Sequence, residues 1–354
     1  MTQKTDDLRI EKTMQLLPPI ALIERFPISD SASETVFACR KAIHNLLHGD
    51  DDRILVVVGP CSIHDVDAAM DYANRLVEMR KKYSGELEIV MRVYFEKPRT
   101  TVGWKGLVND PDMDGSFKIN DGLRIARNLL SKINDLGLPT AGEFLDVISP
   151  QYVADFMSWG AIGARTTESQ VHRELSSGLS CPVGFKNGTN GSIQIAIDGI
   201  GSANNPHNFL SVTKFGHSAI IKTKGNEDCH IILRGGSGQP NYEEKFVNEA
   251  STKLNESGVV DKVMIDFSHA NSAKQFKRQL DVCKDVSSQI ASGNKKIFGV
   301  MVESNIVEGQ QKVIEGKPLT YGQSITDGCI GWEDTETILY DLAQAVSSRR
   351  SGLK

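Results

Sequence analysis

Short apolar runs rich in β-branched residues recur along the chain, and stretches with apolar residues at helical spacing separate them. Such runs predict strands buried on both faces, and the stretches between them predict amphipathic helices. The eight runs are 54–62, 88–96, 139–146, 161–167, 182–188, 230–236, 262–269 and 296–303. The helical stretches include Asp67–Lys81, Asp121–Leu136, Pro150–Trp159 and Ala273–Ala291. Eight successive βα units predict an α/β fold, a (β/α)8 barrel of the TIM type.

Two segments do not fit this repeat. The first fifty or so residues precede the first predicted strand, and residues 209–223 alternate around Gly216 in the manner of an inserted β-hairpin. We therefore expect an N-terminal extension over 1–50, with oligomer or regulatory contacts. The catalytic barrel is expected over 51–350, with the hairpin inserted at about 209–223. The periodicity of these two segments does not identify an effector. Packing between subunits is a sufficient explanation for both segments.

The composition excludes several classes of protein. With 354 residues, 40% of them hydrophobic, the chain can bury a large core, and its net charge of −5 arises from interspersed charges. A broad nucleic-acid surface is therefore not expected. No apolar stretch is long enough for a bilayer and the first residues lack a signal-peptide pattern, so we expect a cytoplasmic protein without membrane contact. Six scattered cysteines without a CxxC pair argue against a disulfide framework, and most of them are expected to be core thiols.

Cations gather at the predicted strand ends. The active site of such a barrel forms where the carboxyl ends of the strands meet. The candidate cations there are Arg92, Lys97, Arg165, Lys186 and Arg234. Any one of them is explained equally well by a structural ion pair. Five together would repel one another unless anions bind among them, and planar Arg groups suit phosphates and carboxylates. We therefore predict a small, multiply anionic ligand, such as a phosphorylated carboxylate with a second phosphorylated partner.

Four potential metal ligands follow strands one, seven and eight: Cys61, His269, Glu303 and Asp327. Taken singly, Cys61 is better explained as a core thiol and His269 as a hydrogen-bonded structural histidine. Strands eight and one are neighbours in a closed barrel, however, so the four side chains are expected to share one location. A mixed sulfur, nitrogen and oxygen set suits one catalytic divalent ion such as Mn²⁺, Fe²⁺, Co²⁺ or Zn²⁺.

Seven segments resemble the metal-dependent class I 3-deoxy-D-arabino-heptulosonate-7-phosphate (DAHP) synthases, with the closest similarity to the phenylalanine-sensitive bacterial type. They are GPCSIH (59–64), MRVYFEKPRTTVGWKGL (91–107), GARTTESQ (163–170), FKNGT (185–189), ILRGG (232–236), DFSHANS (266–272) and MVESN (301–305). The resemblance extends from about residue 6 to residue 350. The stretch GGSGQPNY (235–242) is one residue longer than its family counterpart, which leaves the shape of that loop open.

The resemblance implies a transferase that condenses phosphoenolpyruvate with D-erythrose 4-phosphate and water, giving DAHP and phosphate in the first step of the shikimate pathway. It matches the four metal ligands and places phosphoenolpyruvate among the five cations named above. The run that receives erythrose 4-phosphate matches Lys97, Pro98, Arg99 and Thr100. For the chemistry we expect Lys97 to protonate the new alkoxide and Glu143 to orient or deprotonate the water, beside the metal-binding Cys61 and His269.

The resemblance also implies feedback inhibition by phenylalanine and a homo-oligomer, either a tetramer or a dimer. The matching effector positions are Asp6, Asp7, Phe144, Pro150, Leu175, Leu179, Ser180, Phe209, Ser211 and Ile221. The pair Asp6-Asp7 is typical of the phenylalanine-sensitive type. Ile221 stands where a valine is expected, and its larger side chain is expected to alter affinity but not the effector.

The sequence is also compatible with three other functions. Lys97 or Lys186 at a strand end suits a Schiff-base aldolase. A 3-deoxy-octulosonate 8-phosphate-type synthase differs only in the aldose it accepts, and the long match over 97–107 favours the shorter sugar. A non-catalytic metabolite sensor is the alternative of another class. The intact metal set argues against it, because a binding module needs no such site.

Overall fold

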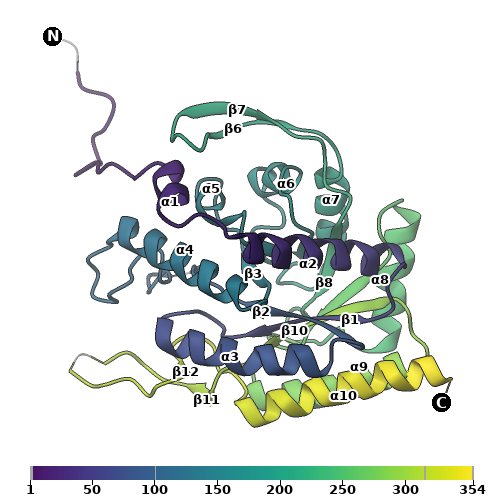
Figure 1. Cartoon of the computed structure of the whole chain (residues 1–354). Coiled ribbons are helices and arrows are strands. Elements are labelled where there is room, and N and C mark those ends of the chain that lie inside the picture. Colours follow the sequence, from purple (N-terminus) through teal and green to yellow (C-terminus); the bar gives the residue numbers. More distant parts are fainter. Residues whose placement is uncertain (1–2, 100, 315, 353–354) are drawn as a thin grey trace.

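A closed barrel of parallel strands forms the centre of the computed structural model, which describes residues 3–99, 101–314 and 316–352 (Figure 1). In order around the barrel, the strands are β1 (Ile54–Gly59), β2 (Leu87–Arg92), β3 (Thr140–Glu143), β4 (Met157–Ile162), β5 (Val183–Lys186), β8 (Cys229–Leu233), β9 (Val263–Asp266) and β10 (Ile297–Glu303). Parallel pairing of β10 with β1 closes the ring and sets Gly59 opposite Glu303. The predicted eight-stranded barrel is confirmed.

Helices surround the barrel and cover the outer faces of its strands (Figure 1). They are α3 (Val66–Lys82), α4 (Ile119–Asp135), α5 (Pro150–Val153), α6 (Gln170–Ser176), α7 (Gln194–Ala203), α8 (Glu244–Glu256), α9 (Gln279–Ala291) and α10 (Trp332–Ser351). Short strands β11 (Val307–Gln310) and β12 (Gln323–Ser324) pair beyond the end of β10. Because helices cover them outside and side chains fill the interior, the strands are buried almost throughout.

One helix of the N-terminal segment belongs to the barrel core. Helix α2 (Asp30–His48) begins where the Ser29 hydroxyl accepts a hydrogen bond from the Ala32 amide, and it ends at Gly49, whose φ is +91°. Its buried side chains form one cluster with the barrel interior: Cys39, Ile43, Leu46 and Leu47 pack with Leu55, Val57, Trp159, Ile232, Met264 and Phe298. Since α2 leads directly into the start of β1, it closes the amino-terminal end of the barrel.

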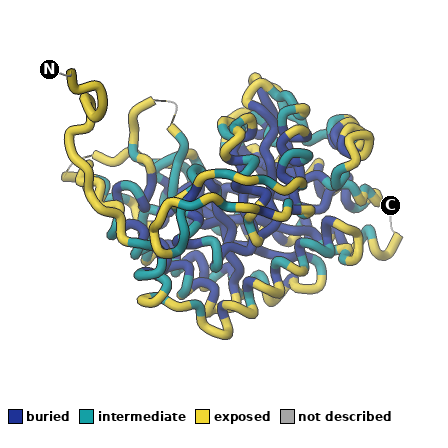
Figure 2. Tube along the Cα trace, turned by 90° about the horizontal axis from the view of Figure 1, so that it is seen from above, coloured by how far each residue is buried: buried dark blue, intermediate teal, exposed yellow. Residues whose placement is uncertain are grey.

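The remaining N-terminal residues and the inserted hairpin lie outside the barrel. Residues 3–17 are exposed and extend away from α1 (Pro19–Arg25), as Figure 2 shows in yellow. Strands β6 (Asn208–Val212) and β7 (Ser218–Lys222) pair antiparallel, and Gly216 adopts a φ of +78° between them. The predicted hairpin is therefore confirmed. The Lys214 ammonium at its tip donates to the Gln151 carbonyl at 2.6 Å, which ties the hairpin to α5.

The fourth strand was misplaced by the sequence pattern. The prediction set a helix over Pro150–Trp159 and a strand over 161–167, whereas α5 ends at Val153 and β4 begins at Met157. Every residue of β4 is buried, so its apolar run has no alternation that distinguishes a strand from a buried helix. The prediction of a helix over Pro150–Trp159 is therefore wrong beyond its first turn.

Several predicted ends also differ from the observed ones. The helix expected from Ala273 starts with the 3₁₀ turn η1 (Phe276–Arg278) and becomes α9 only at Gln279. Ala273 and Lys274 both have a positive φ, which excludes them from a helix. Most of the predicted strands run two to four residues past the observed ones, because the chain leaves the ladder there, whereas the last predicted strand ends at Glu303 as observed.

All six cysteines are buried and free, as expected for core thiols: Cys39, Cys61, Cys181, Cys229, Cys283 and Cys329. Among the described residues, no helix combines the length and apolar character needed to cross a membrane.

The contribution of α2 to the core can be measured by truncating one buried side chain. Ile43→Ala removes fully buried methyl groups from the barrel cluster and should lower the free energy of unfolding by about 2–5 kcal/mol in urea denaturation. The matched control is Phe37→Ala, because Phe37 lies on the same helix but is 71% exposed. Equal losses in both variants would contradict a core role for α2.

Candidate functional site

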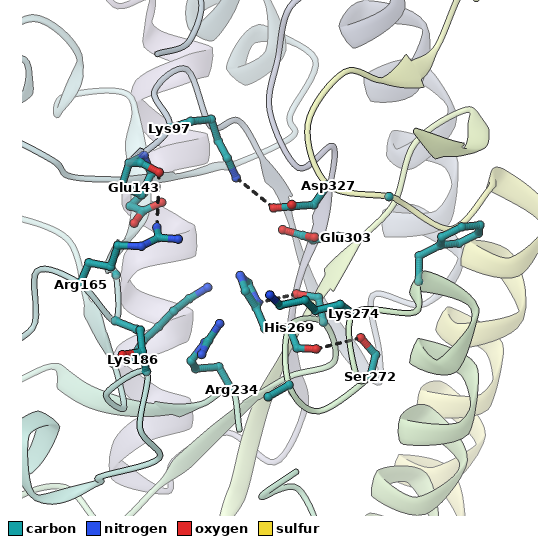
Figure 3. A pocket seen from close by; sticks show the side chains of 18 of the residues that line it. Lys97, Glu143, Arg165, Lys186, Arg234, His269, Ser272, Lys274, Glu303 and Asp327 are labelled. Carbon is teal, nitrogen blue, oxygen red and sulfur yellow. Dashed lines mark hydrogen bonds and ion pairs between the residues drawn. The ribbon is translucent and has the colours of Figure 1, made fainter. Parts of the chain in front are cut away.

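A cavity of about 820 Å³ opens at the carboxyl end of the barrel (Figure 3). It is lined by side chains that follow or end seven of the strands, and these residues predicted from sequence are among them: Arg92, Lys97, Pro98, Arg99, Glu143, Arg165, Lys186, Arg234, His269, Glu303 and Asp327. Thr100, which was also predicted to bind substrate, lies outside the described residues. The fold thus brings together cations, carboxylates and an imidazole from positions spread over more than two hundred residues.

Three of the four predicted metal ligands form a compact cluster at this cavity, where Glu303 and Asp327 line the wall and Cys61 is fully buried beside them. One ligand atom each from Cys61, Glu303 and Asp327 lies within 4.8 Å of the others. The Cys61 thiol donates to Asp327 Oδ2 at 3.4 Å, and the Lys97 ammonium is 3.0 Å from Cys61 Sγ and 3.7 Å from Asp327 Oδ2. A thiol and two carboxylates in this space fit a divalent transition-metal ion.

The fourth predicted ligand, His269, is not part of this three-residue cluster but points into the same cavity (Figure 3). Its Nδ1 lies 3.0 Å from Asp266 Oδ2 and 2.8 Å from the Ser268 hydroxyl. A hydrogen bond from Nδ1 to a carboxylate fixes the ring and leaves Nε2 as the free nitrogen. His269 therefore has the arrangement of a histidine that is oriented to bind through Nε2.

Charge around the cluster changes the pKa values of its members. Burial raises the pKa of the Cys61 thiol to about 11, and the Glu303 carboxylate adds to this effect. For Asp327, burial also acts to raise the pKa, but the Lys97 ammonium and the hydrogen bond from Cys61 outweigh it and lower the value. Lys97 therefore keeps negative charge on the cluster.

Two of the cations are paired with buried carboxylates. The Arg92 guanidinium donates to Glu303 Oε1 at 3.1 Å and lies over the Tyr94 ring, 3.5 Å from its centroid. The Lys186 ammonium donates to Asp266 Oδ2 at 2.8 Å, and both groups are buried. Although burial acts to raise the pKa of Asp266, Lys186 and His269 outweigh it and hold that pKa well below its usual range. These carboxylates reduce the repulsion among the cations.

Two further guanidinium groups have no such partner. Within the part of the chain that the structure describes, neither Arg165 nor Arg234 forms an ion pair. Arg165 donates to the Pro98 carbonyl at 3.3 Å, while the buried Nε of Arg234 has no hydrogen-bond partner. Burial lowers the pKa of Arg234, and the proximity of Arg165 lowers it further. A buried donor such as the Arg234 Nε is normally hydrogen-bonded. Together with the neighbouring guanidinium group of Arg165, it therefore favours an anionic ligand at this place.

Glu143, which was predicted to orient or deprotonate the water, is the last residue of β3 and lines this cavity. A Cβ at position 163 would lie only 2.2 Å from Glu143 Oε1, so Gly163 leaves the space that this carboxylate occupies. Its place across the cavity from Asp327 is visible in Figure 3.

Sequence reasoning missed several residues that line the cavity, above all Lys274 and Ser272. Lys274 is a further cation, and its φ of +58° follows a φ of +51° at Ala273. This backbone turns the chain after β9 back over the cavity. The polar run after the seventh predicted strand was the only signal for these residues, since positive φ values cannot be read from alanine or lysine.

The loop at 235–242, whose shape could not be predicted from the sequence, forms a tight turn beside the cavity. Gly236 and Gln239 exchange backbone hydrogen bonds at 2.9 and 2.8 Å, and the two residues between them, Ser237 and Gly238, have φ values of +48° and +79°. Both of these residues line the cavity. A two-residue turn thus closes this part of the loop.

Most predicted effector positions lie on one side of the barrel, around α5, α6 and the hairpin. In this group are Phe144, Pro150, Leu175, Leu179, Ser180, Phe209, Ser211 and Ile221. The Ser211 hydroxyl donates to the Val147 carbonyl at 3.1 Å, which joins the hairpin to the segment after β3. Asp6 and Asp7 are exposed on the N-terminal arm, which in the single chain extends away from the barrel (Figure 1).

Comparisons with known proteins agree with this architecture. The model described as the DAHP synthetase I family matches residues 25–340. The chain is 67% identical over 350 residues, covering 99% of it and all of its relative, to the Phe-sensitive phospho-2-dehydro-3-deoxyheptonate aldolase of Escherichia coli (strain K12). It is 65% identical over 345 residues to the phospho-2-dehydro-3-deoxyheptonate aldolase of Haemophilus influenzae, covering 98% of this chain and 95% of that protein.

A solved structure gives the same result. The phospho-2-dehydro-3-deoxyheptonate aldolase of Francisella tularensis SCHU S4 matches with a TM-score of 0.94 and 55% identity. The match covers 96% of this chain and 99% of that chain.

The buried pair of Lys186 and Asp266 predicts a specific pattern of stability. Asp266→Asn leaves the Lys186 ammonium buried without a counter-charge and should lower the free energy of unfolding by about 3–5 kcal/mol at pH 7. Because folding lowers the pKa of Asp266, its contribution is complete above the ordinary value of 3.8 and is lost as the pH falls below it. Urea denaturation from pH 7 to pH 3 measures both effects. An Asp266→Asn protein as stable as the wild type would refute the pairing argument, and Lys186→Met in the same background should restore part of the loss.

Proposed function

Because the chain belongs to the DAHP synthetase I family, we propose that it condenses phosphoenolpyruvate with D-erythrose 4-phosphate and water. The products are DAHP and inorganic phosphate, so the enzyme is a transferase of the first shikimate-pathway step. The observation that carries this proposal is the cavity, which gathers the five predicted cations together with Arg99 and Lys274 beside a cluster of one thiol and two carboxylates. Of the five predicted cations, Arg165 and Arg234 have no carboxylate partner among the described residues. The two substrates together supply two phosphates and one carboxylate, which matches this excess of positive charge.

We propose that Arg92, Lys97, Arg165, Lys186 and Arg234 hold the phosphate and carboxylate of phosphoenolpyruvate. The free guanidinium groups of Arg165 and Arg234 support this assignment, since each offers a planar pair of donors to an anionic group. Lys97, Pro98, Arg99 and Thr100 are assigned to erythrose 4-phosphate. Lys97 and Arg99 stand on the segment after β2, at the mouth of the same cavity.

Cys61, His269, Glu303 and Asp327 would hold one divalent ion, which we propose to be Mn²⁺, Fe²⁺, Co²⁺ or Zn²⁺. The closeness of three of these ligand atoms and the free Nε2 of His269 support the set. A bound ion of this kind supplies Lewis-acid polarisation of the aldehyde of erythrose 4-phosphate. The protein side chains account for the remaining steps.

The reaction proceeds through addition and elimination at C2 of phosphoenolpyruvate. Its C3 forms a bond to the aldehyde carbon, which places positive charge on C2 and negative charge on the former aldehyde oxygen. Lys97 delivers a proton to that oxygen, because its ammonium is held within the cavity beside Cys61 and Asp327. Water then adds to C2 while Glu143 orients it and accepts its proton. The hemiketal phosphate collapses with cleavage of the C2–O bond, releasing inorganic phosphate and leaving the ketone.

Charge at the two lysines argues against a Schiff-base mechanism. Burial acts to lower the pKa of Lys97, but Cys61 and Glu303 outweigh it, and the resulting pKa is raised above the ordinary value. A Schiff base requires a neutral amine, which this environment disfavours. Lys186 is engaged with Asp266 in a buried ion pair.

We propose that phenylalanine inhibits the enzyme by binding near the hairpin, α5 and α6. The identity to the Phe-sensitive relative supports this effector. Inhibition then acts as a shift between two subunit arrangements of a homo-oligomer, either a tetramer or a dimer. The cytoplasm is the proposed location.

The direct test is consumption of phosphoenolpyruvate by chelator-stripped protein supplied with erythrose 4-phosphate. Addition of Mn²⁺ should restore turnover, and phenylalanine should then suppress it more strongly than tyrosine. Absence of turnover with every divalent ion tried would refute the proposed reaction. Restored turnover without any response to phenylalanine would refute only the proposed regulation.

Replacement of Lys97 and replacement of Cys61 should affect different properties, namely turnover and metal content. Lys97→Ala should lower kcat by about 10²–10⁴-fold while the protein retains its metal, because a proton donor is lost. Cys61→Ser should instead reduce the bound metal measured by elemental analysis. Lys105→Ala, on the same loop but exposed, and Cys283→Ser, at a buried thiol far along the chain, are the controls. Wild-type turnover in Lys97→Ala would exclude the proposed proton transfer.

A further inference from the structure

A second group of metal-ligating side chains lies at the opposite end of the barrel from the cavity. His44 and His48 come from the last turns of α2, and Asp228 immediately precedes β8. His44 Nδ1 and His48 Nε2 are 2.8 Å and 2.9 Å from the same atom, Asp228 Oδ1. One ligand atom from each of the three residues therefore lies within 4.8 Å of the others. No step of the proposed reaction uses these residues.

Rigid elements hold all three side chains in place. Residues four apart on a helix share one face, and the buried side chains of Ile43 and Leu47 fix α2 in the barrel core. On the other side, the Asp228 amide donates to Asn226 Oδ1 at 3.2 Å. The Asn226 side chain in turn donates to the carbonyls of Ser176 and Cys181 at 3.1 and 3.0 Å. Packing on one side and hydrogen bonds on the other thus fix the two backbone segments that carry the cluster.

The charges and exposure of the cluster favour an ion over a purely structural contact. Among the described residues, the only ion-pair partners of Asp228 are the two histidines, so no permanent cation neutralises this carboxylate. Each ring directs a nitrogen at the same carboxylate oxygen, and a divalent ion bound among these three atoms would replace the N–H protons between them. The side chains are 39%, 33% and 17% exposed for His44, His48 and Asp228, so an ion and its water ligands have access.

We propose that His44, His48 and Asp228 form a second divalent-metal site, which takes Zn²⁺ with water completing the coordination. Two imidazole nitrogens and one carboxylate oxygen are a ligand set that Zn²⁺ prefers. The ion joins the end of α2 to the start of β8 and so stabilises the closure of the barrel at its amino-terminal end. Because the catalytic cavity lies at the carboxyl end, occupancy of this site leaves turnover unchanged.

The number of zinc ions bound per chain tests the proposal. In equilibrium dialysis of the full chain followed by elemental analysis, the wild type should bind one more equivalent of Zn²⁺ than His48→Gln. Cys61→Ser should retain the equivalent at His44, His48 and Asp228, and a double variant, Cys61→Ser with His48→Gln, should lose it. The control His217→Gln alters an exposed histidine of the hairpin and should bind as the wild type does. Equal Zn²⁺ binding by His48→Gln and the wild type would overturn the proposal.

Thermal unfolding gives a readout that does not depend on the catalytic site. In the Cys61→Ser background, Zn²⁺ well above its dissociation constant should raise Tm by several degrees, because the ion binds only the folded state. That rise should disappear when His48→Gln or His44→Gln is added. Circular dichroism and Mn²⁺-supported turnover of the single variant His48→Gln confirm that it folds. A rise of the same size with and without His48 would also overturn the proposal.

Discussion

Closure of the barrel between β1 and β10 is the constraint on which the rest of the structure depends. The register of this pair sets Gly59 opposite Glu303, and the Ser304 amide donates to the Gly59 carbonyl at 2.9 Å. Cys61, two residues beyond Gly59, therefore meets Glu303. The Ile330 amide donates to the Glu303 carbonyl at 3.0 Å, which brings the loop with Asp327 to the same place. A cluster of candidate metal ligands drawn from distant parts of the chain thus follows from one strand pairing.

The two ends of the barrel differ in the side chains that they gather. At the amino-terminal end, α2 fills the opening with apolar side chains, and His44, His48 and Asp228 join it to the start of β8. At the carboxyl end, cations are gathered against their mutual repulsion. Glu303 and Asp266 reduce that repulsion by pairing with Arg92 and Lys186, while Arg165 and Arg234 form no ion pair with any described residue. Such groups are oriented before the substrate arrives, so little reorganisation is needed in the transition state.

Much of this arrangement could be predicted from the sequence, because buried parallel strands and polar strand ends both leave a readable pattern. Hence the barrel, the hairpin and the gathering of the cations were predicted. The start of β4 was misplaced, since a run buried on both faces carries no periodicity. Pairings between distant residues, such as Lys186 with Asp266, left no local signal. The spacing of His44 and His48 was visible, but Asp228 joins them only through the fold.

We propose that Arg165 and Arg234 are held without a carboxylate partner in order to bind an anionic substrate. Thermal unfolding with and without phosphoenolpyruvate, at constant ionic strength, tests it most directly. Phosphoenolpyruvate should raise Tm of the wild type, whereas pyruvate, which lacks the phosphate, should not. The rise should be lost in the double variant Arg165→Gln with Arg234→Gln. A rise of equal size in that variant would contradict the claim.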